Sequence, residues 1–305
     1  MTGSTISTQD RARGSLLGLA CGDAVGTTVE FVPRGSFRPV TDMVGGGPFE
    51  LRPGQWTDDT SMALCLAESL LKCDGFNPAD QMLRYLRWFR EGYLSSNGEC
   101  FDIGNTVHRS LIEFERTGEP FSGPTDPRSA GNGSIMRLAP VVLLAFPDRE
   151  AASIYAAQSS RTTHGAPEAV EACGILAGIL SALLAGERKE AAVSSVVPTD
   201  SMSASLRDIT SGIYRQKVED EIRGSGYVVE SLEAALWCFY QSDDFEEAVL
   251  RAANLGDDAD TTAAVCGQLA GALWGESGIP GPWLERLAMA ARIRSMADDL
   301  LAAAF

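Results

Sequence analysis

Two short clusters of acidic and hydroxyl side chains carry the residue types best suited to chemistry in this chain. The first is Trp56-Thr57-Asp58-Asp59-Thr60-Ser61, and the second is Gly256-Asp257-Asp258-Ala259-Asp260-Thr261-Thr262. A run of apolar residues at helical spacing follows each cluster. Carboxylate and hydroxyl oxygens are ligands of hard divalent cations, and a site with enough acids holds two ions about 3.5–4 Å apart. We therefore predict that the clusters form the two halves of one metal site.

Helix capping is the alternative interpretation of each cluster. Asp and Thr are favoured N-cap residues, and acids in the first helical turn interact favourably with the helix dipole. Capping needs only one oxygen acceptor, however, whereas the second cluster has three acids, at 257, 258 and 260. Adjacent carboxylates repel one another unless a cation neutralises them, and neither cluster contains Lys or Arg. The occurrence of two such clusters favours metal binding.

The composition of the chain argues against several classes of protein. The chain has 305 residues, of which 45% are hydrophobic, and this is enough to bury a large core. Its net charge of −16 argues against nucleic-acid binding. The seven cysteines form no C-x-x-C pair, so we expect reduced thiols in a cytoplasmic protein. The polar start lacks an apolar signal core, and the longest weakly polar run, 172–186, is short for a membrane span.

The spacing of apolar residues predicts an all-α protein that forms a single compact domain over residues 1–305, because sustained period-two alternation is scarce. The region 186–226 is polar and irregular, and we expect short helices and loops there. The segment 33–55 is rich in Gly and Pro, which predicts a long loop that acts as a flap over the first cluster. Predicted helices cover residues 9–22, 57–73, 78–92, 102–116, 134–146, 149–160, 166–186, 228–240, 244–254, 260–275 and 281–303.

Four further polar features have both a structural and a functional interpretation. Glu30, between two apolar residues, is either partly buried or a surface residue at a helix end. Asp102 opens the stretch Asp102-Ile103-Gly104-Asn105-Thr106, where it could cap the following helix. The loop Gly131-Asn132-Gly133-Ser134 could present N–H groups to a phosphate or be a plain turn. His164 precedes a helix and could contact a ligand or cap that helix. Zinc chemistry is disfavoured by the scarcity of His and paired Cys.

A series of motifs spanning nearly the whole chain resembles the ADP-ribosylglycohydrolase family. The Asp-Ile-Gly-Asn-Thr stretch is most similar to the bacterial dinitrogenase reductase-activating glycohydrolases within that family. The paired Asp clusters make the resemblance specific, whereas the glycine motifs alone would not. The motifs are residues 18–26 with Glu30, 56–60, 102–106, 131–137, 163–164 and 256–261.

The resemblance implies an all-α fold, two divalent cations (Mg²⁺ or Mn²⁺) and a set of site residues. Glu30 and Asp102 match acids assigned to catalysis, and Asp257 lies outside the family's ligand pattern. The metal ligands implied by the motif match are Thr57, Asp58, Asp59, Asp258, Asp260 and Thr261. The residues expected to line an ADP-ribose pocket are Gly104, Asn105, Gly131, Asn132, Gly133, Ser134, His164 and Tyr227.

The implied activity is hydrolysis that removes ADP-ribose from a mono-ADP-ribosylated protein and releases ADP-ribose as product. An arginine linkage is favoured because the carboxylate of Asp102 suits a guanidinium group, although a serine linkage is an alternative. Two other classes remain open: a two-metal enzyme acting on phosphate esters, and a non-catalytic module that binds ADP-ribose or serves as an immunity protein against an ADP-ribosylating toxin. Intact acidic clusters favour catalysis, and the segment before Gln9 is short for a blocking arm.

Overall fold

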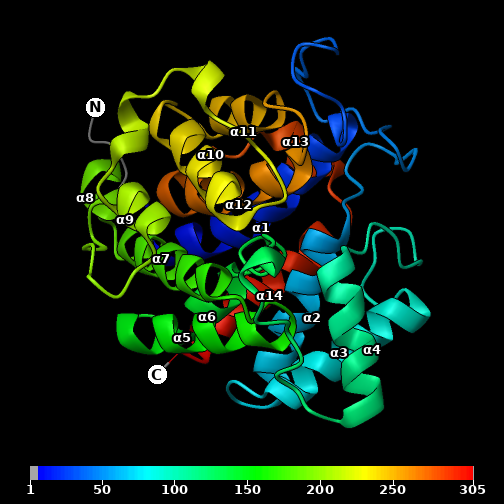
Figure 1. The fold of residues 1–305 in the computed structure, drawn as a ribbon. Coiled ribbons are helices and arrows are strands. Elements are labelled where there is room, and N and C mark those ends of the chain that lie inside the picture. Colours follow the sequence, from blue (N-terminus) through cyan, green and yellow to red (C-terminus); the bar gives the residue numbers. More distant parts are fainter. Residues whose placement is uncertain (1–5, 305) are drawn as a thin grey trace.

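Helices supply the regular structure throughout the computed structural model, which describes residues 6–304 (Figure 1). That range contains no named strand, only isolated bridges between Gly46 and Leu51 and between Gly131 and Tyr227. The prediction of an all-α fold is confirmed. The helices are α1 (Thr8–Gly26), α2 (Asp58–Lys72), α3 (Pro78–Glu91), α4 (Asn105–Thr117), α5 (Ala139–Ala145), α6 (Arg149–Thr163), α7 (Pro167–Leu184), α8 (Lys189–Val193), α9 (Ala204–Thr210), α10 (Val228–Tyr240), α11 (Phe245–Ala253), α12 (Ala259–Trp274), α13 (Gly281–Arg286) and α14 (Ala290–Ala302).

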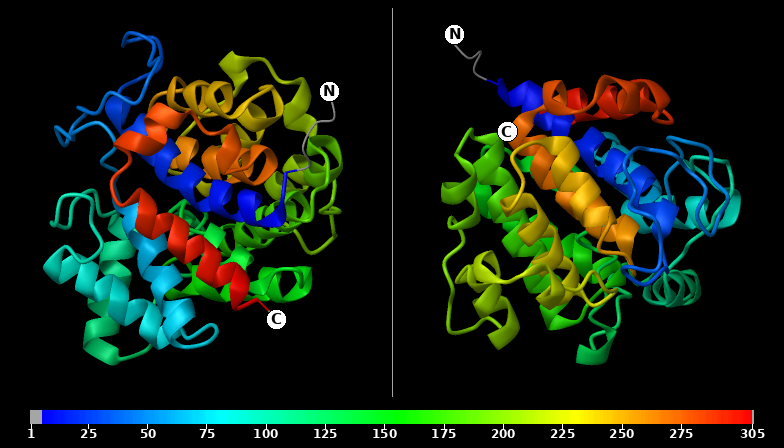
Figure 2. Two further views of the ribbon diagram at one scale, coloured as in Figure 1. Left: turned by 180° about the vertical axis from the view of Figure 1, so that it is seen from behind. Right: turned by 90° about the horizontal axis from the view of Figure 1, so that it is seen from above.

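Helices α1 and α12 lie side by side through the middle of the molecule (Figures 1 and 2). Residues four apart on a helix share one face, and each helix presents a stripe of Gly or Ala to the other. The stripe of α1 is Gly14, Gly18, Gly22 and Gly26, which faces Gly271, Gly267, Ala263 and Ala259 of α12 in that order, so the helices are antiparallel. A Cβ on Gly22 would lie 2.0 Å from the carbonyl oxygen of Ala263. Only small residues allow this approach.

This contact corrects the sequence-based end of the first helix. We expected a helix over 9–22 that ended or bent at its glycines, but α1 continues through Gly26 because the glycines face the backbone of α12. The antiparallel arrangement also brings the C-terminal end of α1 next to the N-terminal end of α12. The residues after α1 and the acids that begin α12 therefore lie at the same end of the pair.

The other helices surround this central pair. Helices α10 and α11 pack against α12, and α14 runs beside α1 and α2 (Figure 2, left). Helix α7 packs against α6 and also contacts α12. Among the described residues, α7 is the helix long and apolar enough to cross a membrane, and 67% of that window is buried inside the molecule, as in a core helix.

Three predicted helices differ from the structure. The helix expected over 102–116 begins at Asn105, because Asp102 has a left-handed backbone with a φ of 59°. The helix expected over 134–146 is shortened to α5, and residues before it form a turn. The helix expected over 281–303 is divided into α13 and α14 at Met289, whose φ is 56°. Residues 186–226 form short helices and loops, as expected.

Candidate active site

Residues from seven segments of the chain line one cavity of about 460 Å³. Most of the residues expected at a site from the sequence are among them. The lining includes Glu30, Asp58, Asp102, Gly104, Asn105, Gly131, Asn132, Gly133, His164, Asp258, Asp260 and Thr261. The cavity has an acidic wall formed by the carboxylates, and the glycine loop and His164 form another part of its lining.

The acids of the two clusters do not act as ordinary helix caps. Helix α3, away from the cavity, has a side-chain cap: Asn77 accepts hydrogen bonds from the N–H groups of Ala79 and Asp80. Helices α2 and α12 have no such bond from their own N-cap residues, Thr57 and Asp258. Neither N-cap residue therefore caps its own helix. In the second cluster, Asp260 Oδ1 still accepts a hydrogen bond from the N–H of Thr261 at 2.8 Å, so one of its three acids binds an N–H group at the start of α12.

Asp23 of α1 performs the capping function for α2 instead. Its carboxylate is fully buried and accepts hydrogen bonds from the N–H and hydroxyl groups of both Thr57 and Thr60, at 2.6–3.0 Å. These bonds satisfy N–H groups at the start of α2, which have no partner within the helix. Asp23 thus fixes the helix start that carries Asp58 and Asp59. The sequence analysis did not include Asp23 among the site residues, although an isolated acid in an apolar stretch was a signal for it.

The two acidic clusters, which lie about 200 positions apart, meet at this point. The hydroxyl of Thr57 lies 3.2 Å from Asp260 Oδ2, and the hydroxyl of Thr261 lies 3.4 Å from Asp59 Oδ2. Thr57, Asp59 and Thr261 are all buried. The side-chain amide of Asn132 donates to Asp258 Oδ2 at 2.8 Å, so the glycine loop is tied directly to the second cluster.

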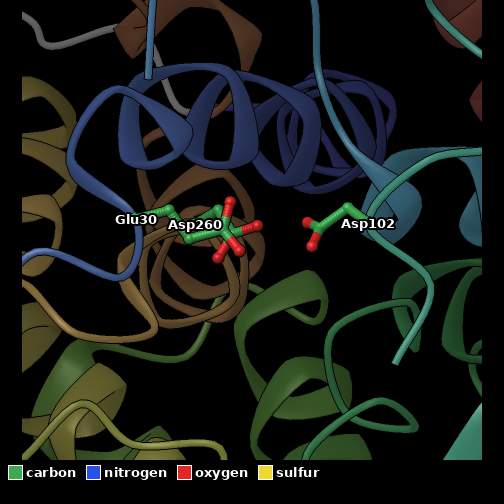
Figure 3. Close-up of side chains that lie close together, drawn as sticks. All are labelled: Glu30, Asp102 and Asp260. Carbon is green, nitrogen blue, oxygen red and sulfur yellow. The ribbon is translucent and has the colours of Figure 1, made fainter. Parts of the chain in front are cut away.

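Glu30 and Asp102 complete the acidic wall. One oxygen from each of Glu30, Asp102 and Asp260 lies within 4.8 Å of the other two, and Figure 3 shows the carboxylate of Asp102 pointing across a gap toward those of Glu30 and Asp260. The backbone beside Glu30 is held by two hydrogen bonds, from Phe31 N to Asp257 O (2.7 Å) and from Asp257 N to Val32 O. Phe31 and Asp257 both have a left-handed backbone, which is uncommon outside glycine. The exposed side chain of Asp257 does not line the cavity.

Burial and mutual repulsion disfavour ionisation of these acids. Burial, followed by the charge of Asp102, raises the pKa of Glu30 to about 10. Burial is also the main reason that the pKa of Asp102 rises to about 7. The pKa values of Asp58, Asp59 and Asp260 are raised well above the usual range by burial and then by neighbouring carboxylates. Protein groups alone therefore leave the negative charge of the wall poorly compensated.

The donor set fits a hard divalent cation. Two buried oxygens, Glu30 Oε2 and Asp59 Oδ1, have no hydrogen-bond partner within residues 6–304. Over the same range, no ion pair with Lys or Arg involves an acid of the cavity. Closely spaced, buried carboxylates and hydroxyls without a cationic side chain are the ligands that Mg²⁺ and Mn²⁺ prefer.

Two residues expected in the ligand pocket lie outside this cavity. The hydroxyl of Ser134 is buried and accepts a hydrogen bond from Ser160 at 3.0 Å. Tyr227 lines an adjoining cavity of about 610 Å³, which shares Thr106 and Gly131 with the first. The phenol of Tyr227 donates to Glu168 at 2.6 Å. Gly226 also lines both cavities, so the cavity beside Tyr227 adjoins the one that contains the acidic wall.

Comparisons with known proteins indicate the family to which the chain is similar. The family model described as ADP-ribosylglycohydrolase matches residues 4–305. ADP-ribosylarginine hydrolase Tri1 of Serratia proteamaculans (strain 568) is 47% identical over 291 residues, which cover 95% of this chain and 79% of that protein. The ADP-ribosyl-dinitrogen reductase glycohydrolase of Rhodospirillum rubrum is 33% identical over 310 residues, covering 100% and 99%. A solved structure described as an ADP-ribosylglycohydrolase-related protein complex has a TM-score of 0.86 at 44% identity, covering 98% of this chain and 99% of that one.

Proposed function

The chain belongs to the ADP-ribosylglycohydrolase family, and we propose that it is a hydrolase that removes ADP-ribose from modified arginine side chains of proteins. The observation that carries this proposal is the meeting of both acidic clusters with Glu30 and Asp102 in one cavity. The names of the relatives at 47% and 33% identity include the same class of reaction. The substrate is a mono-ADP-ribosylated protein, and the products are ADP-ribose and the restored side chain.

The acidic wall holds two divalent cations, Mg²⁺ or Mn²⁺. When bound, such ions supply electrostatic stabilisation and orientation of oxygen groups. The number of buried acids supports two ions, because one ion would leave much of the charge uncompensated. The proposed ligands are Thr57, Asp58, Asp59, Asp258, Asp260 and Thr261.

Asp102 and Glu30 provide the proton chemistry of the reaction. Hydrolysis of the bond between the anomeric carbon and the arginine nitrogen removes one proton from water and adds one to the leaving nitrogen. Asp102 lines the cavity and is only partly buried, so its carboxylate can pair with a guanidinium that enters from outside. A carboxyl group in this position can take a proton from water or give one to the leaving nitrogen. Glu30, buried beside Asp260, orients the groups that react.

The wall formed by the glycine loop and His164 holds the ADP-ribose. Gly131 and Gly133 leave room for the ring of His164 against their backbone, and Gly104 and Asn105 lie at the exposed start of α4. His164 faces the same space. Tyr227, in the adjoining cavity, is the residue expected to contact the adenosine. Ser134 supports the loop from inside.

Three broader proposals accompany the reaction. Nearly all buried apolar residues of the described range form one continuous cluster. This supports one domain over residues 1–305, of which 1–5 and 305 lie outside the described range. The seven unpaired cysteines support a cytoplasmic location. The burial of α7 supports a chain without a membrane span.

Hydrolysis of an ADP-ribosyl-arginine peptide, followed by chromatography of the products, tests the proposal. We expect release of free ADP-ribose with Mg²⁺ or Mn²⁺ and none with a chelator. Asp260→Asn should lose this activity, whereas Asp257→Asn should keep it, because the side chain of Asp257 is exposed and Asn tolerates its backbone conformation. Binding of ADP-ribose without any release would instead indicate a binding module.

A further inference from the structure

Arg137 is a fully buried arginine without a carboxylate partner among the described residues. One terminal nitrogen donates a hydrogen bond to the hydroxyl of Thr163 at 2.6 Å, and the other lies 3.6 Å from the sulfur of Met62. The guanidinium carbon lies 4.6 Å from the centroid of the Tyr85 ring. Burying an unpaired charge is unfavourable, so this position calls for an explanation beyond packing.

The hydrogen bond from Arg137 determines the direction of the next one. The hydroxyl oxygen of Thr163 also lies 2.9 Å from Nδ1 of His164. Because a guanidinium can only donate, the Thr163 oxygen is its acceptor, and the hydroxyl proton is left to be donated. The nearby positive charge makes that hydroxyl a stronger donor and a weaker acceptor. This arrangement favours Nδ1 of His164 as the acceptor of the Thr163 hydroxyl proton.

His164 then carries its single proton on Nε2. Burial, together with the charge of Arg137, lowers the pKa of His164 to about 3, so the ring is neutral near pH 7. A neutral imidazole has one N–H, and with Nδ1 as acceptor this is Nε2–H. Nε2 has no hydrogen-bond partner in the described part of the chain, and the ring borders the cavity.

The surrounding loop indicates what this donor meets. The ring of His164 packs against Gly131 and Gly133, where an added Cβ would lie 3.3 Å from Nε2 and 2.7 Å from Cε1, respectively. The backbone N–H of Gly133, which also lines the cavity, makes no hydrogen bond within residues 6–304. Unpaired donors on His164 and Gly133 at one wall favour a ligand atom that only accepts, such as an anionic oxygen.

We propose that Arg137 and Thr163 are positioning residues that hold His164 as a fixed Nε2–H donor to an anionic oxygen of the ligand. The identity of that ligand rests on the proposed function, under which the oxygen belongs to a phosphate of ADP-ribose. The buried guanidinium of Arg137 thus acts on the ligand through Thr163 and His164, without touching it. It also keeps a positively charged His164 from forming.

Nitrogen NMR of histidine-labelled protein tests the tautomer directly. The chain has only two histidines, and the exposed His108 can be identified with His108→Gln. In the wild-type protein we expect a protonated Nε2 and an unprotonated Nδ1 for His164, unchanged between pH 6 and pH 8. Thr163→Val removes the hydroxyl and should abolish this preference, whereas Thr163→Ser should preserve it. An Nδ1–H tautomer in the wild-type protein would overturn the proposal.

Calorimetric titration with ADP-ribose gives the second readout. Thr163→Val should bind ADP-ribose about tenfold more weakly, and Thr163→Ser within about twofold of wild type. If Thr163→Val does not fold, Arg137→Met provides the same comparison. Unchanged tautomer and affinity in a folded variant would refute the positioning role. If the wild-type protein shows the expected tautomer but does not bind ADP-ribose, the positioning of His164 by Arg137 and Thr163 is supported. ADP-ribose is then rejected as the ligand, and the proposed function with it.

Discussion

Replacing Gly22 by alanine tests whether the close contact between α1 and α12 sets the geometry of the site. The new Cβ would lie 2.0 Å from a backbone oxygen of Ala263, whereas ordinary contact begins at 3.4 Å, so the backbones must move apart by about 1.4 Å. Such overpacking costs about 1–3 kcal/mol, occasionally more. The higher helix propensity of alanine offsets up to about 1 kcal/mol of this loss in the free energy of unfolding. We expect a net loss of about 2 kcal/mol in the free energy of unfolding.

The displacement also affects the acids. Asp23 follows Gly22 directly and is bonded to the start of α2, while Asp260 lies in the first turn of α12. Moving α1 away from α12 would separate these two groups, so metal-dependent release of ADP-ribose should fall at least tenfold. Urea unfolding with a constant m value and a product-release assay measure the two effects on the same preparations.

Gly174→Ala is the matched control. Gly174 also lies inside a helix, α7, but the nearest atom to its added Cβ is the flexible Ser153 hydroxyl at 3.6 Å. Alanine should therefore raise the stability by up to about 1 kcal/mol there and leave activity unchanged. Equal effects of Gly22→Ala and Gly174→Ala on stability would refute the reasoning about close contact. A destabilised Gly22→Ala protein with full activity would show that the helix spacing does not set the site.

The charge of the acidic wall leads to three further predictions. Asp58→Asn should abolish both the rise in melting temperature on adding Mg²⁺ or Mn²⁺ and the activity, and a variant that keeps both would remove Asp58 from the ligand set. In the metal-free folded protein, the pKa of Asp102 is raised to about 7 and that of Glu30 to about 10. The folded protein therefore keeps protons on these acids at pH values above about 4, where the unfolded chain has released them. Its unfolding free energy, measured in urea with a chelator, should therefore fall as the pH rises from about 5 to about 7, and a rise would contradict the assignment. Asp102→Asn should lower kcat for an arginine-linked substrate about a hundredfold or more. The affinity for ADP-ribose, measured by calorimetry, should change much less. Equal losses in kcat and in affinity would make Asp102 a binding residue only.

The helical class was accessible from the sequence because it depends on local patterns, whereas the set of site residues followed from the resemblance to a family. Apolar spacing predicted α10 over 228–240, the same bounds as in the structure. The unusual density of acids pointed correctly to one joint site, since a cap needs only one acceptor. The meeting of Asp59 with Thr261 was a hypothesis until the fold placed both in the core.

The remaining features depend on contacts distant in sequence. The role of Asp23 could not be predicted, because its partners Thr57 and Thr60 lie on another helix. The glycines of α1 resemble a helix end in the sequence, and only the backbone of α12 explains their presence within a helix. Asp102 has the residue type of an N-cap, but its backbone is left-handed, so it does not begin the helix. Helix α4 begins three residues later, after Gly104 as the N-cap.

The central claim is tested most directly by release of free ADP-ribose from two peptides that differ only in an arginine or a serine linkage. Each peptide is incubated with Mg²⁺, with Mn²⁺ and with a chelator. We predict metal-dependent release from the arginine-linked peptide and little or none from the serine-linked one. Release from the serine-linked peptide alone would contradict the role given to Asp102 in binding a guanidinium. Equal release with the chelator would contradict the metal site.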